Sequence, residues 1–125
     1  MNIAVFFAIA LGGAVGSLLR YMVGLWVSAH WASYFYLATF SVNILGSFLM
    51  GCLYGLFLLR PEIPEVIRLG SMVGLLGGFT TFSSFSIESF RLLQNGHILT
   101  ALGYILLSVA LGLLAAWAGV VLTKS

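Results

Sequence analysis

Segment 74–86 holds the residues whose types and spacing are best suited to chemistry. It places the adjacent pair Gly77-Gly78 ahead of five hydroxyl residues interleaved with three phenylalanines. Adjacent glycines form helix poorly, so we expect a helix that breaks at this pair. Carbonyls freed at the end of the first half-helix can bind a cation, and amides at the start of the second favour an anion. The alternative is a kinked packing helix whose hydroxyls bond their own preceding carbonyls.

Phe82 and Phe85 are three residues apart and therefore share one helix face. Each ring carries the positive part of its quadrupole at its edge, so the two edges can flank a small anion. Ser83 and Ser84 supply hydroxyl donors beside the rings. Phenylalanines at this spacing also pack in ordinary cores, but the neighbouring hydroxyls at an expected helix break favour a binding site.

Asn43, Tyr104 and Ser108 are polar side chains inside otherwise apolar stretches. Burying an amide without partners costs several kcal/mol, so Asn43 must bond another helix or line a pore. In a pore, its NH2 group would be a good anion ligand. Tyr104 and Ser108 share a helix face at a spacing of four, so they either continue a polar track or bond a neighbouring helix.

Arg20 and Glu88 are the charged residues placed within apolar stretches. Arg20 is either a membrane-edge anchor whose stem snorkels to the interface or a vestibule charge that draws anions inward. Glu88 lies near the end of its stretch, where we expect it to pair with Arg91 three residues later or with an arginine elsewhere.

The composition decides which solvent surrounds these residues. Of the 125 residues, 62% are hydrophobic and only 6% are charged, against about 25% charged in an average soluble domain. So few charges cannot cover a water-soluble surface, so the bilayer is the solvent. No basic residue precedes the first apolar stretch, which we therefore expect to be a mature span and not a cleaved signal peptide.

The uncharged stretches predict one all-α transmembrane domain, residues 1–125, with four helices. Each expected helix reaches the roughly 20 residues that span hydrocarbon. A polar, aromatic patch at residues 28–33 is expected to form the interfacial turn between the first two helices. We expect a multi-pass protein of the cell inner membrane or plasma membrane. The expected spans are residues 3–27, 35–59, 66–90 and 98–123.

Glycine rows predict close helix packing. Small residues at a spacing of four let helix backbones approach where packing replaces the hydrophobic effect. Thin helices packed in this way leave little room for a water-lined route within one subunit, so a pore should need a second copy. The rows are Gly12 and Gly16; Gly51 and Gly55; and Gly70, Gly74 and Gly78.

Basic residues are almost balanced between the two sides of the expected helices. Arg60, Arg68 and Lys124 fall on one side, and Arg20 and Arg91 lie toward the other. Because lysines and arginines in short loops hold their side in the cytoplasm, so small a difference permits insertion both ways round. An antiparallel homodimer of one sequence is then possible.

Several function classes are disfavoured. The net charge of +2 is too dispersed for nucleic acid, and the single cysteine, Cys52, excludes a cysteine-based metal cluster. No HExxH, GxSxG or phosphate-loop motif is present, so we expect no enzyme. The rival transport function is a small multidrug-resistance exporter that exchanges protons for organic cations. Such an exporter needs a carboxylate in the first span, whereas Glu88 is the only acid within any span and lies near an end.

With these motifs in place, the chain resembles the Fluc family of fluoride channels, also called CrcB proteins. The resemblance covers essentially the whole chain, and the third motif is highly specific. The motifs are residues 12–16 with Arg20-Tyr21, Val42-Asn43 with Gly46-Ser47, and residues 77–86. Ser84 stands where a threonine is common, and Gly112 stands where some relatives carry another hydroxyl residue.

The resemblance implies passive export of cytoplasmic fluoride by an antiparallel, dual-topology homodimer with two pores, each lined by both subunits. The backbone carbonyls of Gly77 and Thr80, two from each subunit, would hold one structural sodium ion at the dimer centre. Arg20 and Glu88 would belong to the vestibule. The implied fluoride-contacting residues are Asn43, Phe82, Ser83, Ser84, Phe85, Tyr104 and Ser108.

Overall fold

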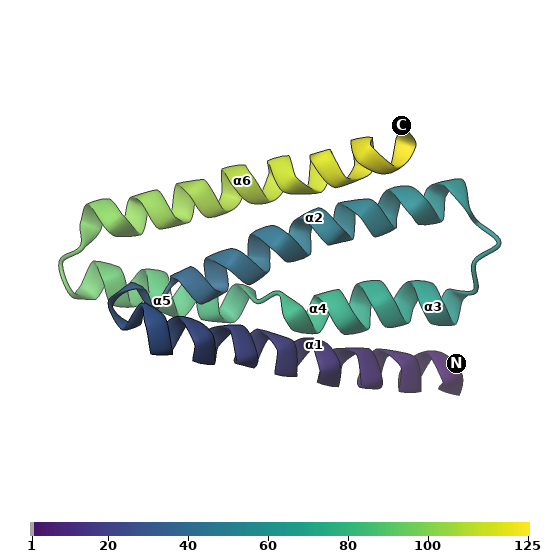
Figure 1. The fold of residues 1–125 in the computed structure, drawn as a ribbon, viewed down its shortest axis with the longest axis horizontal. Helices are drawn as coiled ribbons and strands as arrows, with labels where there is room; N and C mark the ends of the chain where they lie inside the picture. The colour runs from purple at the N-terminus through teal and green to yellow at the C-terminus, as the bar shows by residue number, and fades with distance from the viewer. Residues whose placement is uncertain (1) are drawn as a thin grey trace.

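The computed structural model describes residues 2–125 and is all-helical, with four segments long and apolar enough to cross a bilayer. This confirms the expected four-span, multi-pass membrane fold. Both termini and the connection between the second and third spans lie at one end of the bundle (Figure 1). The four segments are α1 (Ile3–His30), α2 (Leu37–Leu59), the third span (Glu65–Gln94) and α6 (Ile98–Lys124).

The third span is interrupted, as expected, but the break lies beyond the glycine pair. Gly77 and Gly78 are helical, whereas Thr80 (φ −89°, ψ 160°) and Thr81 (φ −153°, ψ 125°) are extended. The expected position of the break was therefore wrong by a few residues. The segments of this span are α3 (Glu65–Leu69), the π-helical η2 (Gly70–Leu76), α4 (Gly77–Phe79) and α5 (Phe82–Gln94).

Two glycines of this span, Gly74 and Gly78, lie in close contact with α1. A Cβ atom added to Gly78 would lie 2.7 Å from the carbonyl oxygen of Gly13, and one added to Gly74 would lie 2.8 Å from that of Ile9. Such distances exclude any side chain, so the glycines serve the approach of two backbones. The glycine row of the third span therefore packs against α1, which confirms the expectation of close helix packing.

A second glycine contact joins α2 to α6. A Cβ atom on Gly119 would lie 2.7 Å from the backbone nitrogen of Cys52, and one on Gly51 would collide with the carbonyl of Ala116. Cys52 is half-buried and unoxidised beside this contact. The bundle therefore consists of two tight helix pairs, α1 with the first half of the third span and α2 with α6 (Figure 1).

The first turn of the chain comes later than expected. Helix α1 continues to His30, so residues 28–30 are helical, and the turn begins at Trp31 with the 3₁₀ helix η1 (Ala32–Tyr34). The His30 ring stacks on Trp26 with centroids 4.5 Å apart, and its Nδ1 lies 2.9 Å from the Trp26 carbonyl oxygen. These contacts one turn apart hold the polar residue within the helix.

The other two connections follow their local sequence. Prolines flank the α2–α3 loop, where the Arg60 side chain donates to Glu62. Between α5 and α6, Gly96 has φ +82°, the left-handed conformation that suits glycine at a helix end. The His97 amide donates to the Leu92 carbonyl at 2.9 Å and closes the turn.

An aromatic cluster packs the ends of α2, α5 and α6 together. Tyr104 lies between Phe85, at 5.2 Å between ring centroids, and Tyr36, at 5.3 Å. Burial of these rings fixes the start of α5 relative to α6 and so positions one wall of the site. The cluster comprises Leu92, Ala101 and Tyr104, with Phe35, Tyr36, Phe40 and Phe85 packed against them.

Candidate anion site at the helix break

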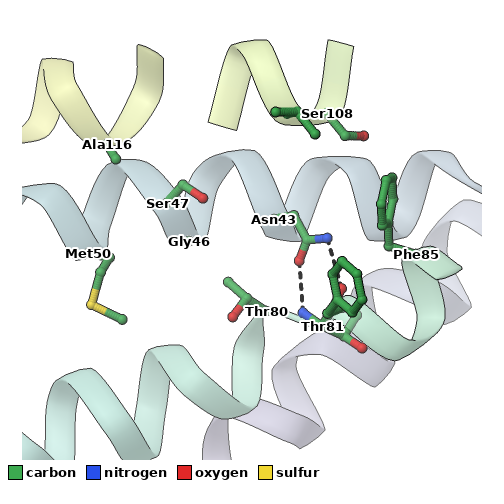
Figure 2. A pocket seen from close by; sticks show the side chains of 11 residues that line it. Asn43, Gly46, Ser47, Met50, Thr80, Thr81, Phe85, Ser108 and Ala116 are labelled. Atoms are coloured by element: carbon green, nitrogen blue, oxygen red, sulfur yellow. Dashed lines mark hydrogen bonds between the residues drawn. The ribbon is translucent and has the colours of Figure 1, made fainter. Parts of the chain in front are cut away.

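Asn43 on α2 holds the extended peptide at the break. Its Nδ2 donates to the Thr81 carbonyl oxygen at 2.9 Å, and its Oδ1 accepts from the Thr81 amide at 2.8 Å. Of the two alternatives for this part-buried amide, the bond to another segment of the bundle is therefore present (Figure 2). A carboxamide nitrogen carries two hydrogens, so one donor of Asn43 remains for another partner.

Thr81 begins the second half-helix. The Ser84 amide donates to Thr81 Oγ1 at 3.2 Å, and the Ser83 hydroxyl lies 3.3 Å from the same atom. Threonine is a favoured N-cap, so its place before the aromatic run could have indicated that Thr81 caps α5. Thr81 was not among the expected site residues. The amides at the start of α5 face the break, where they favour negative charge.

A pocket of about 380 Å³ lies between α2, the break and α6. Four of the expected contact residues line it, namely Asn43, Phe82, Phe85 and Ser108, whereas Ser83, Ser84 and Tyr104 do not. The pocket is open on one side. Its lining is Asn43, Gly46, Ser47, Met50, Thr80, Thr81, Phe82, Phe85, Ser108, Val109 and Ala116 (Figure 2).

The two phenylalanines are adjacent but differently supported. Their ring centroids are 5.8 Å apart with the planes tilted by 48°. Phe85 packs on Tyr104, whereas Phe82 is 78% exposed and has little cover within one chain. Both rings line the pocket, Phe85 supported by Tyr104 and Phe82 largely uncovered.

Ser108 brings an unsatisfied hydroxyl to the pocket. Its Oγ is buried, and it has no hydrogen-bond partner among residues 2–125. Buried polar atoms in native proteins nearly always have a partner, so this hydroxyl is suited to a ligand or a water molecule. Tyr104, one turn earlier, points elsewhere and donates to Glu88 Oε1 at 3.0 Å.

The expected ion pair of Glu88 was wrong. Glu88 accepts from the Tyr104 hydroxyl and from Thr39 Oγ1, each at 3.0 Å, and forms no salt bridge within the described chain. Arg91 instead lies over the Phe35 ring, with its guanidinium carbon 4.1 Å from the centroid. Two hydroxyl donors satisfy the carboxylate at lower desolvation cost than a buried ion pair would require.

Arg20 points toward the break. Its Nε donates to the Gly78 carbonyl oxygen at 3.1 Å, so the side chain does not extend to the membrane edge as a free anchor. Gly78 lies in the last turn of the first half-helix, where carbonyls lack helical donors. A cation there offsets the negative end of the helix dipole.

Two further carbonyls at the break have lost their helical donors. The Thr81 amide, which would serve the Gly77 carbonyl in a continuous helix, donates to Asn43. The Ser84 amide, which would serve the Thr80 carbonyl, donates to Thr81 Oγ1. Free carbonyls at an unwound helix suit a small hard cation. No cluster of histidine, cysteine or acidic ligands exists among residues 2–125.

Comparison with known proteins identifies the family. The sequence profile described as CrcB-like protein, Camphor Resistance (CrcB) matches residues 7–120. The chain belongs to this CrcB-like family. The match covers every residue that lines the pocket, from Asn43 to Ala116.

Curated relatives of this CrcB-like chain match it over nearly its whole length. A protein of Pseudomonas fluorescens (strain Pf0-1) is 57% identical over 117 residues, 94% of either chain. One from Azotobacter vinelandii is 55% identical over 122 residues, and one from Pseudomonas putida is 51% identical over 122 residues, each covering 98% of either chain. All three are named Fluoride-specific ion channel FluC. These names denote channels, in agreement with the expectation that the chain is not an enzyme.

Proposed function

We propose that this protein is a fluoride-selective channel through which cytoplasmic fluoride leaves passively, reducing fluoride toxicity. The observation that carries the proposal is the pocket at the helix break. It combines two phenylalanine rings with the spare donor of Asn43 and the unpartnered hydroxyl of Ser108. The names of the relatives favour this function over the multidrug-resistance exporter.

The lining suits a small anion. Fluoride must exchange its water for protein donors, and here it meets the Asn43 amide, the Ser108 hydroxyl and the edges of Phe82 and Phe85. A narrow passage with few donors repays the desolvation of a small anion better than that of a large one, so chloride is excluded by size and desolvation. Ser83, Ser84 and Tyr104 would contact the ion elsewhere along its path.

The working unit would be an antiparallel, dual-topology homodimer with two pores, each lined by both subunits. Support comes from the 78% exposure of Phe82 and from the open side of the pocket, which a second copy would cover. The near balance of basic residues between the two ends permits both orientations. Arg20 and Glu88 would lie in the vestibules, where Arg20 attracts anions.

A structural sodium ion would sit at the dimer centre, held by the Gly77 and Thr80 carbonyls of both subunits. These are the carbonyls whose helical donors bond Asn43 and Thr81 instead. When bound, the ion supplies positive charge that offsets freed carbonyl dipoles at the two breaks. Asn43 and the Thr81 N-cap hold those carbonyls apart from the helix and so keep them available.

Such a channel belongs in the cell inner membrane or plasma membrane. Hydrogen fluoride crosses lipid as a neutral acid and ionises in the more neutral cytoplasm, where the anion is trapped. A passive route for fluoride then lets the ion leave down its gradient. No reaction or energy source is required from the protein.

Flux from liposomes tests the proposal. Purified protein in vesicles loaded with potassium fluoride should release fluoride to an ion-selective electrode once valinomycin removes the counter-voltage. Vesicles loaded with chloride should keep their contents. Proton-coupled uptake of an organic cation without fluoride release would instead indicate the exporter, and vesicles as tight as protein-free ones would refute a channel.

A further inference from the structure

Ser47 lies on α2 one helical turn beyond Asn43 and lines the same pocket. Figure 2 shows its side chain directed toward α6, the helix that carries Ser108. Ser47 is half-buried. The pocket thus has hydroxyl groups on two facing helices.

Several helical hydroxyls donate to a carbonyl of their own helix, but Ser47 does not. Ser86 donates to the Phe82 carbonyl at 3.0 Å, and Ser89 donates to the Phe85 carbonyl at 2.8 Å. Ser71 likewise donates to Ile67 at 2.7 Å. The Ser47 hydroxyl forms no hydrogen bond within residues 2–125, so it is available to a ligand in the pocket.

Gly112 on α6 keeps the space in front of Ser47 open. A Cβ atom added to Gly112 would meet one atom within 4 Å, the Ser47 hydroxyl oxygen at 3.8 Å. Unlike Gly51 and Gly119, Gly112 is therefore not required for the approach of α2 to α6. The missing side chain leaves a gap between the helices, one turn beyond Ser108, and the Ser47 hydroxyl borders it.

The geometry points to Ser47 as a further fluoride-contacting residue, facing the gap at Gly112 and following Ser108 along the ion path. This inference rests on the proposed function. An ion that moves along the pocket from Asn43 meets the Ser108 hydroxyl from α6 and the Ser47 hydroxyl from α2. Each hydroxyl donates one hydrogen bond to the anion and replaces part of its lost hydration.

Removal of the hydroxyl tests the inference. Ser47→Ala should lower fluoride flux in liposomes by about tenfold or more, the effect of losing a hydrogen bond to a charged group. Ser71→Ala, which removes a hydroxyl already bound to its own helix, is the matched control and should conduct like the wild type. Both variants should elute as the wild type does in size-exclusion chromatography.

Relocating the hydroxyl across the gap makes the test specific. Ser47→Ala combined with Gly112→Ser should recover most of the flux, because a serine at 112 returns a donor to the same space. Ser47→Ala combined with Gly112→Ala should not recover. Equal recovery by both, no recovery by either, or full flux in Ser47→Ala alone would overturn the role of Ser47. Wild-type vesicles that retain fluoride in the same assay would refute the proposed function instead.

Discussion

At the scale of single residues, Asn43 provides the hydrogen bonds that a broken helix lacks in lipid. An unwound peptide exposes an amide and a carbonyl that water cannot satisfy at membrane depth. Asn43 satisfies both groups of Thr81 with one carboxamide and retains a spare donor. Structural support and anion contact are therefore compatible roles for this one side chain.

If Phe82 and Phe85 line the ion path as proposed, their replacement should remove most of the fluoride conduction. Phe82→Ile or Phe85→Ile should reduce fluoride flux by about tenfold or more, because ring edges are lost while apolar bulk is kept. Phe82 is the cleaner probe, since its ring is exposed, whereas Phe85 also packs on Tyr104. Fluoride release from liposomes measures the effect, with chromatography to confirm unchanged assembly. Undiminished flux in both variants would remove the rings from the ion path.

Arg20→Gln separates the charge of this residue from its hydrogen bond. Glutamine Nε2 is as many bonds from the backbone as arginine Nε, so the donor to Gly78 can be kept. Assembly should be normal, while flux at low ionic strength should fall by roughly tenfold because the local anion concentration drops. The deficit should shrink as salt screens the field.

The ionic-strength series is the decisive measurement for Arg20. A flux deficit that is the same at every salt concentration would mean that the Arg20 charge only offsets the dipole at the end of the first half-helix and does not attract anions. Full flux at low salt would remove the vestibule role altogether.

At the scale of the helices, glycines lie where two helix backbones come into close contact. Backbone contacts pair α1 with the first half of the third span and α2 with α6. The pocket lies where these pairs meet at the break. Gly24 and Gly103, by contrast, meet no other atom within 4 Å in the described part of the chain.

Gly119→Ala and Gly24→Ala should therefore have opposite effects on stability. The new methyl group at 119 would lie 2.7 Å from the Cys52 nitrogen, so overpacking should cost about 1–3 kcal/mol. At 24 nothing lies within 4 Å, and the better helix propensity of alanine should stabilise by up to about 1 kcal/mol. Thermal unfolding in detergent compares the two. Equal melting temperatures would show that α2 and α6 leave room for a methyl group between Gly119 and Cys52.

At the scale of the whole molecule, a single chain leaves its candidate site incomplete. Phe82 is uncovered and the pocket is open on one side. Apolar side chains elsewhere on the surface can face lipid, but the polar groups of Asn43 and Ser108 in an open pocket at membrane depth need protein or water beside them. A second copy is the simplest cover consistent with the glycine-packed helices.

Dual topology predicts that both orientations coexist in one membrane. With Cys52 replaced by alanine and Ser125 by cysteine, a membrane-impermeant thiol reagent should label about half of the C-termini in intact cells. Adding Asn95→Lys should shift that fraction, because it adds positive charge to the α5–α6 loop. Labelling that is complete or absent in the parent would contradict an antiparallel dimer.

The sequence by itself predicted the solvent, the number of spans and the segment that carries the candidate site. Uncharged stretches of bilayer length predict transmembrane helices. Hydroxyls among phenylalanines beside a glycine pair indicate a candidate site in one segment of the third span. These features depend on composition and local spacing, which are visible without coordinates.

Only the tertiary structure decided how that segment is used. The break lies at Thr80-Thr81, while Gly77 and Gly78 remain helical and Gly78 packs closely on α1. Glu88 accepts hydrogen bonds from hydroxyls of α2 and α6 and does not pair with Arg91. The Arg20 side chain donates to the Gly78 carbonyl. Each outcome depends on contacts between residues far apart in the chain, whose relative positions are set by helix packing and not by local spacing.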